Sequence, residues 1–167
     1  FKMRMQEEFR RAKASGHPVS MLMSDIDLFR NINNKYGHQG GDQALIELAG
    51  VIKEPVHKLG SDDIAGRYGG EEFCVLLPES GPERGLEVSE MIRQNIEQHP
   101  IPVGDNEFAK ITISIGVSSY PLHGQHIHEA DDFVKLADEA LYLCKDRGRY
   151  CCALFEPGAS PTASPAG

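Results

Sequence analysis

Residues 67–77, RYGGEEFCVLL, determine the local fold and locate its chemistry. Two glycines separate a strand-like run that ends at Tyr68 from a second apolar run over residues 72–77. This arrangement predicts a β-hairpin, because the tight turn needs positive φ, which glycine adopts without strain. Glu71 and Glu72 then lie at the rim of a sheet. Since consecutive strand residues face opposite sides, we expect one glutamate to bind a ligand and the other to support it.

Short strands and helices alternate on both sides of this hairpin. The patterns predict helices over 4–15, 28–35, 41–59, 82–98 and 129–147, and further strands over 19–26, 63–68, 111–120 and 150–155. Asp27 is expected to cap the second helix, which the segment around Gly37 ends. This order predicts an α+β fold: a mainly antiparallel sheet of about five strands, flanked by helices, with Asp25 and the hairpin at one edge.

The composition is that of one globular domain. Of 167 residues, 40% are hydrophobic and 25% charged, which favours a single domain over residues 1–155 followed by a disordered tail rich in Pro, Ser and Ala over 156–167. The net charge of -8 argues against nucleic acid as a partner. No apolar run is long enough to span a membrane, so we expect a cytoplasmic domain without direct membrane contact. The four cysteines, without CxxC spacing, are expected to be reduced core or edge residues.

Three motifs occur in a fixed order: DIDLFRNINNKYGHQGGD over 25–42, GGEEF over 69–73 and ADEALYLCKDRGR over 137–149. Together they resemble the signatures of the GGDEF-domain diguanylate cyclases, whose turn reads GG[D/E]EF. The resemblance implies a fold like the palm of polymerases and class III nucleotidyl cyclases, which agrees with the predicted strand order.

The resemblance also implies a reaction and partners. Members condense two GTP molecules into cyclic di-GMP and release two pyrophosphates. Each active site holds one GTP, so a second copy of the domain must face the first across a two-fold axis. An upstream sensor or receiver domain in the full-length protein is the implied regulator.

A divalent ion, Mg²⁺ or Mn²⁺ in its place, is the implied cofactor. Hard cations take oxygen ligands, and such an ion would stabilise charge on phosphoryl oxygens. The resemblance assigns it to Asp25, the carbonyl of Ile26 and Glu71, with Glu72 as a supporting or second-metal ligand. Glu71 is also the implied acceptor of the hydroxyl proton. Alternatively, these acids are solvated turn residues, but they would then repel one another with nothing gained.

Phosphate recognition falls to the segment after Asp27 and to the third motif. The backbone amides of Leu28 and Phe29 are expected to be free first-turn donors. Arg30 stands where the family commonly carries a lysine that stabilises the transition state, although a planar guanidinium differs from a point ammonium. Lys145 and Arg149 match the residues that hold the β- and γ-phosphates. The alternative for each cation is an ordinary exposed surface residue.

Asn33 and Asp42 match the family's guanine-binding pair. A carboxylate can accept hydrogen bonds from both the ring N–H and the exocyclic amine of guanine, which adenine cannot reproduce. Asp42 therefore favours GTP over ATP. His38 matches a position near the substrate, although a histidine beside a glycine break is equally typical of capping or packing.

The inhibitory product site of many family members, Arg-x-x-Asp, is incomplete. Gly60 stands in the position of the arginine, so product feedback through this site is expected to be weak or absent. A second group, His123, His126 and His128, fits no closed zinc ligand set and is expected to lie in a solvated loop.

Two other functions remain open at this point. A non-catalytic module that binds GTP or cyclic di-GMP would normally lose the signature acids and keep the inhibitory site, the reverse of this sequence. A promiscuous dinucleotide cyclase would carry a smaller residue in place of Asp42.

Overall fold

The computed structural model describes residues 1–59 and 62–159 and contains a central five-stranded sheet. The strand order is β2-β3-β1-β6-β7, and all neighbours are antiparallel except β6 and β7. The strands are β1 (Val19–Ile26), β2 (Ile64–Gly69), β3 (Glu72–Pro78), β6 (Ile113–Tyr120) and β7 (Cys152–Leu154). The predicted α+β class and the mainly antiparallel sheet are confirmed.

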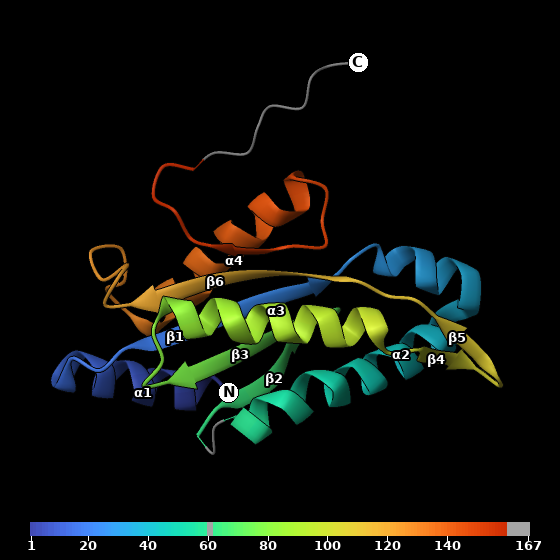
Figure 1. Cartoon of the computed structure of the whole chain (residues 1–167), viewed down its shortest axis with the longest axis horizontal. Coiled ribbons are helices and arrows are strands. Elements are labelled where there is room, and N and C mark those ends of the chain that lie inside the picture. Colours follow the sequence, from blue (N-terminus) through green and yellow to red (C-terminus); the bar gives the residue numbers. More distant parts are fainter. Residues whose placement is uncertain (60–61, 160–167) are drawn as a thin grey trace.

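Helices cover both faces of this sheet (Figure 1). One apolar cluster joins the sheet to α2 (Phe29–Leu59) and α3 (Pro82–Gln98), and a second joins it to α1 (Lys2–Ser15) and α4 (Ala130–Asp146). Along β1, Leu22 belongs to the first cluster while Met21 and Met23 belong to the second. Burial on both faces explains why β1 is mostly apolar before Asp25.

The turn between β2 and β3 lies one residue later than predicted. Gly69 pairs with Glu72, so the two turn residues are Gly70 and Glu71, and Gly70 has φ 49°. A bulge between Arg67 and Gly69 leaves Tyr68 without a partner on β3, and this extra residue moves the turn by one position. Glu71 therefore belongs to the turn itself, whereas Glu72 is the first residue of β3.

Asp27 does not cap α2, so this prediction was wrong. The helix begins at Phe29, after Leu28 with φ 55°, and the Asp27 carboxylate accepts hydrogen bonds from elsewhere in the fold. Gly37 does interrupt the helix as expected, with φ 75° and ψ 171°. Figure 1 shows α2 as two segments that run in different directions.

A second, two-stranded sheet between α3 and β6 was not predicted. It consists of β4 (Ile101–Gly104) and β5 (Glu107–Ala109), joined at Asn106, which has φ 58°. Strands of four and three residues are too short to show alternation. The hairpin packs closely on α2, because a Cβ on Gly40 would lie 2.5 Å from the carbonyl oxygen of Val103.

The histidine loop is only partly solvated. His123 is buried, its Nδ1 accepts a hydrogen bond from the Ser119 amide at 3.0 Å, and its ring packs edge-on against Phe155. Burial lowers the pKa of His123. The prediction of a solvated loop was therefore wrong for this residue, whose role is structural.

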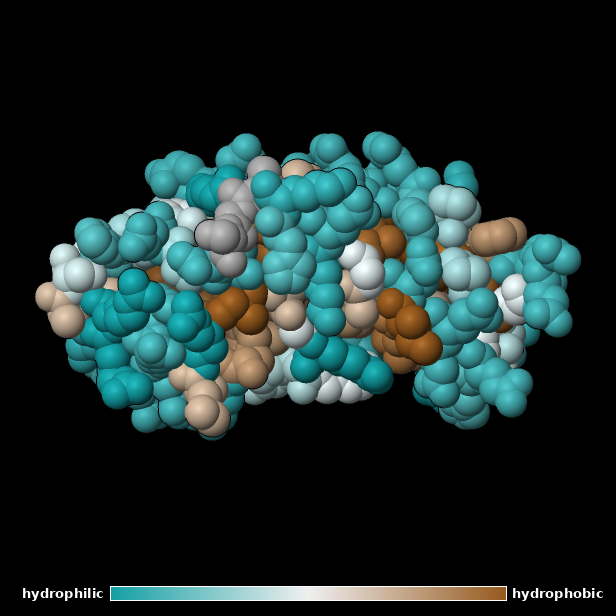
Figure 2. All heavy atoms as spheres, turned by 90° about the horizontal axis from the view of Figure 1, so that it is seen from below, coloured by the Kyte–Doolittle hydropathy of each residue, from teal (hydrophilic) through white to brown (hydrophobic). Residues whose placement is uncertain are grey.

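The prediction about Gly60 and most of the predicted tail over 156–167 lie outside the described residues. Within the described residues, none of the helices combines the length and apolar character of a membrane span. The face in Figure 2 is mainly hydrophilic, with small separate hydrophobic areas.

Gly116 on β6 sets the distance between the sheet and α4. A Cβ there would lie 2.0 Å from the carbonyl oxygen of Ala137 and 2.3 Å from the amide nitrogen of Leu141. Gly116→Ala should therefore lower the free energy of unfolding by about 2–3 kcal/mol, measured by urea denaturation. Gly50→Ala is the control, because a Cβ at that helical position meets nothing within 4 Å and should stabilise the fold by about 0.5–1 kcal/mol. Equal stability of the Gly116 variant and the wild type would contradict this packing.

Candidate active site

Three acids meet where β1 ends beside the β2–β3 turn. Asp25 is the direct cross-strand partner of Glu72, and the amide of Ile26 donates a hydrogen bond to the carbonyl oxygen of Glu71 at 3.3 Å. The predicted convergence of Asp25 and the hairpin at one sheet edge is confirmed. By strand alternation Asp25 and Glu72 lie on the α4 side of the sheet, as Met23 does.

The electrostatics of this edge disfavour the charged carboxylates. Burial raises the pKa of Asp25, a hydrogen-bonded ion pair with Lys145 at 2.9 Å opposes that rise, and the charges of Glu71 and Asp27 add to it. Burial, followed by the charge of Asp25, likewise raises the pKa of Glu72. Like charges directly opposite each other in a sheet are destabilising. A positive charge in addition to Lys145 would relieve this repulsion.

A hollow of about 370 Å³ lies between the start of α2 and the turn before β3. Six residues predicted for the site line it: Phe29, Arg30, Asn33, His38, Asp42 and Glu71. Asn33 and Asp42 reach it from opposite sides of the helix break at Gly37. The structure thus brings the predicted base-binding pair and the turn acid together.

Gly41 makes room for the side chain of Asn33. A Cβ at position 41 would lie 1.9 Å from Asn33 Oδ1 and 3.0 Å from its Cγ. Because these atoms are the end of a flexible side chain, an added Cβ would displace the Asn33 amide and leave the helix in place. The absence of a side chain at position 41 therefore leaves room for the amide of Asn33 beside the hollow.

Of the two cations of the third motif, Lys145 lies in the last turn of α4 and Arg149 follows that helix. The ammonium of Lys145 pairs with Asp25 instead of facing the hollow. Arg149 follows α4, is exposed and has φ 67°. Its amide donates to the carbonyl oxygen of Cys144 at 2.9 Å, which folds the segment back onto the helix. Neither residue lines the hollow beside α2.

Leu28 and Phe29 come before the first helical hydrogen bonds of α2. The Leu28 carbonyl accepts from the Asn31 amide at 2.8 Å, so the turn is tight at this end. N–H groups at the start of a helix have no acceptor in the helix ladder, so the position of Leu28 and Phe29 is compatible with their predicted role as donors to an anion.

Sequence reasoning missed two residues of the site. Arg67 lines the hollow, and its Nε donates to the carbonyl oxygen of Gly70 at 2.8 Å, which braces the turn that carries Glu71. Asp27 is buried and accepts from the Tyr150 amide at 3.1 Å, which ties the segment after Arg149 to the end of β1. The acid-x-acid pattern around Ile26 was the available signal for Asp27, but it was interpreted as a helix cap.

Two further hydrogen bonds fix the carboxylate of Asp27. Thr112 Oγ1 and Ser114 Oγ both donate to it at 2.7 Å. Ser114 Oγ in turn accepts from the Tyr150 amide at 3.0 Å. Asp27 is thus a positioning residue that joins β1, β6 and the segment after α4.

The residues at this edge fit a divalent ion only in combination with a further ligand. Within residues 1–59 and 62–159, no three His, Cys, Asp or Glu side chains are grouped so that they could hold a metal ion together. Asp25, Glu71 and the Ile26 carbonyl offer hard oxygen donors in a place with excess negative charge. Mg²⁺ typically uses one or two carboxylates and completes its coordination with water and substrate phosphate. The donor chemistry therefore fits Mg²⁺.

Comparison with known proteins identifies the family. The family model described as "Diguanylate cyclase, GGDEF domain" matches residues 1–151. Diguanylate cyclase A of Treponema denticola is 44% identical over 131 residues, which cover 78% of this chain and 33% of the relative. The chain therefore belongs to the GGDEF diguanylate cyclase domain family, and it spans about a third of the length of the curated relatives it matches.

Solved structures agree with this assignment. The GGDEF domain of YfiN (TpbB) from Pseudomonas aeruginosa superposes with a TM-score of 0.84 at 29% identity, covering 93% of each chain. The active GGEEF domain of a diguanylate cyclase from Vibrio cholerae gives a TM-score of 0.79 at 34% identity, covering 92% of this chain and 93% of that one.

The raised pKa of Asp25 predicts a pH-dependent cost to stability. Because the fold favours the protonated acid, its charge destabilises the protein above the folded pKa, and this cost disappears as pH falls below the unfolded value. Asp25→Asn should therefore melt at a higher temperature than the wild type at pH 7.5, with a difference that shrinks towards pH 4. Asp105→Asn, on the exposed turn of the small hairpin, is the control. Its melting temperature should equal that of the wild type at both pH values. A lower melting temperature for Asp25→Asn at pH 7.5 would contradict the account.

Proposed function

We propose that this domain is a diguanylate cyclase that condenses two GTP molecules into cyclic di-GMP with release of two pyrophosphates. One observation carries the proposal: Asp25 and Glu71 lie at one sheet edge, beside a hollow that contains Arg30, Asn33 and Asp42. Acids that suit a divalent ion, a cation that suits phosphate and a pair of groups that suits guanine thus stand side by side.

Guanine recognition is assigned to Asn33 and Asp42. The Asp42 carboxylate accepts from the ring N–H and the exocyclic amine, and the amide of Asn33 completes the contact with the base edge. Adenine offers no such donor pair, so Asp42 favours GTP over ATP. His38 lines the same hollow, which supports its proposed role near the substrate.

The triphosphate is held by the amides of Leu28 and Phe29 and by three cations. Lys145 and Arg149 bind the β- and γ-phosphates, and Arg30 stabilises charge on the leaving pyrophosphate. In the structure Lys145 neutralises Asp25 instead. Its ammonium must therefore leave the carboxylate to reach a phosphate.

Asp25, the Ile26 carbonyl and Glu71 would hold Mg²⁺, with Mn²⁺ as a substitute, and Glu72 supports them from β3. When bound, the ion stabilises negative charge on phosphoryl oxygens and lowers the pKa of the attacking hydroxyl. Glu71 accepts the proton of that 3′-hydroxyl. The 3′-oxygen then bonds to the α-phosphorus of the facing GTP as the bond from that phosphorus to pyrophosphate breaks.

Ring closure requires this step twice, so two copies of the domain face each other across a two-fold axis. A domain upstream in the full-length protein, of the sensor or receiver kind, would control this pairing. The rate should therefore rise more than linearly with the concentration of the domain.

Removal of the Glu71 carboxylate should abolish the reaction. With concentrated protein, GTP and Mg²⁺, the wild type should form cyclic di-GMP, and Glu71→Gln should be slower by on the order of 100-fold or more, measured by chromatography of the products. Glu139→Gln, on the exposed side of α4, is the control and should retain the wild-type rate. A wild type that binds GTP but forms no dinucleotide, even when fused to a dimerising helix, would favour the non-catalytic binding module.

Gly41→Ala should weaken guanine recognition by displacing the amide of Asn33. Affinity for a non-hydrolysable GTP analogue should fall on the order of tenfold, as expected for loss of one base contact, while stability changes little. Calorimetric titration measures this change. Gly50→Ala, on the exposed side of the same helix, should bind like the wild type. Equal affinity of the two variants for the GTP analogue would contradict the assignment of Asn33 to guanine binding.

A further inference from the structure

Two cysteines bracket the segment that carries Lys145 and Arg149. Cys144 lies in the last turn of α4, and Cys151 directly precedes β7. The segment between them contains three consecutive residues with positive φ: Gly148 at 109°, Arg149 at 67° and Tyr150 at 52°. Such angles are costly for residues other than glycine and persist only where the surroundings enforce them.

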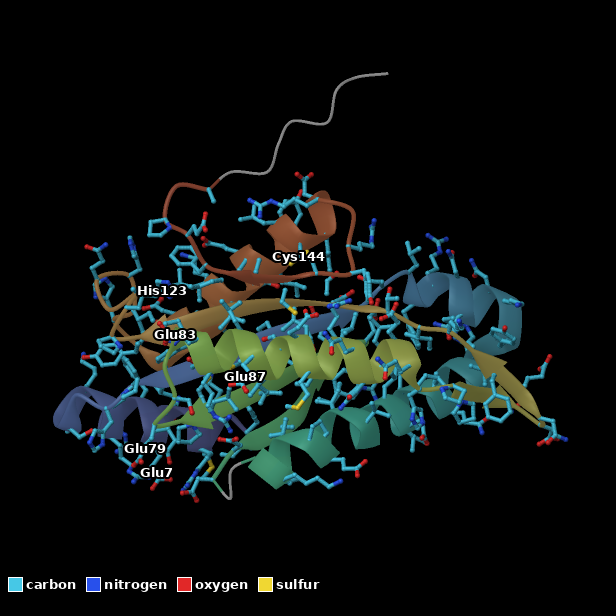
Figure 3. All side chains as sticks on the ribbon, viewed as in Figure 1. Glu7, Glu79, Glu83, Glu87, His123 and Cys144 are labelled. Carbon is cyan, nitrogen blue, oxygen red and sulfur yellow. The ribbon has the colours of Figure 1, made fainter. Side chains whose placement is uncertain are left out.

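Both cysteines contact the same residue of β6, Ile115. The thiol of Cys144 donates to the carbonyl oxygen of Ile115 at 3.6 Å, and the carbonyl oxygen of Cys151 accepts from the Ile115 amide at 2.9 Å. Figure 3 places Cys144 where α4 meets β6. The two residues are therefore held together by the sheet, independently of the segment that joins them.

The side chain of Cys151 faces α4, whereas that of its neighbour does not. Cys152 packs with the cluster beneath α3, and its thiol lies 3.8 Å from Glu90, while Ala153 packs on the α4 side. Since strand residues alternate, Cys151 shares the α4 side with Ala153. Burial, followed by the neighbouring Cys151 thiol, raises the pKa of Cys144. Of the adjacent pair, Cys151 is the one on the α4 side of the sheet, where Cys144 lies.

We propose that Cys144 and Cys151 form a reversible disulfide that weakens triphosphate binding. This inference rests on the proposed function, because Lys145 and Arg149 are assigned to the GTP phosphates there. A disulfide brings two sulfurs to about 2.05 Å, well inside a thiol contact. Cys151 must then move towards α4 and pull on Tyr150, whose amide is fixed by Asp27, so the backbone of Arg149 must change.

The oxidant is a low-molecular-weight disulfide such as oxidised glutathione. The thiolate of Cys151, which is partly exposed, attacks one sulfur of that disulfide and releases one small thiol. The thiolate of Cys144 then attacks the Cys151 sulfur and releases the second. Two electrons pass from the protein to the small disulfide, and the two protein thiol protons end on the released thiols. Burial raises the pKa of Cys144, so closure should accelerate with pH.

The test treats the native wild type with oxidised glutathione and then counts thiols and maps cross-linked peptides by mass spectrometry. The wild type should lose two thiols to a Cys144–Cys151 bond. Cys152→Ser is the matched control and should behave identically, whereas Cys151→Ser should form no intramolecular bond. A bond that forms only in urea, or that includes Cys152 in the native protein, would overturn the proposal.

Nucleotide binding is then measured on the reduced and oxidised forms of the same proteins. Oxidation should weaken binding of a non-hydrolysable GTP analogue on the order of tenfold in wild type and in Cys152→Ser, as for loss of a charged hydrogen bond, and should leave GMP binding unchanged. Dithiothreitol should restore affinity, and Cys151→Ser should show no change. Unchanged affinity in the bonded protein would overturn the proposal. Reduced protein that binds no GTP analogue would overturn the proposed function. Thiol counting still shows whether the disulfide forms, so the two failures can be told apart.

Discussion

The antiparallel register between β1 and β3 is the constraint on which the site depends. It places Asp25 opposite Glu72 and brings the Glu71 carbonyl to the Ile26 amide. This register is fixed by burial on both faces, because a slip of one residue would exchange the two apolar clusters. The apolar strands thereby hold carboxylates together in a place where their charges are unfavourable. The hydrophobic cores stabilise an arrangement that electrostatics alone would separate.

Lys145 partly compensates this repulsion in the structure. Its ion pair with Asp25 lowers the pKa of that acid, but burial and neighbouring acids outweigh it. The pair also connects the acids to the segment after α4, which Asp27 ties to β1 and β6 through Tyr150. The proposed metal-binding and phosphate-binding groups therefore share one hydrogen-bonded framework. A change in the segment after α4 can therefore reach the acids through Asp27 and Lys145.

Much of the fold and of the site could be predicted from sequence. The bounds of β1 and α3, the sheet class and the meeting of Asp25 with the hairpin follow from apolar periodicity and turn chemistry. The small hairpin over 101–109 did not, because its strands are too short for a period to appear. Asp27 was assigned to a helix end, since capping is local and visible in sequence, whereas Thr112, Ser114 and Tyr150 are distant along the chain. The pairing of Lys145 with Asp25 and the role of Arg67 likewise depend on tertiary contacts.

The central claim is that Asp25 and Glu71 bind one divalent ion together with GTP. Crystals grown with Mn²⁺ and a non-hydrolysable GTP analogue would test it through the anomalous signal of the metal. The account predicts a manganese ion within coordination distance of both carboxylates and the Ile26 carbonyl, with phosphate oxygens completing its coordination. An ion bound through phosphate alone, or one that contacts neither carboxylate, would contradict it.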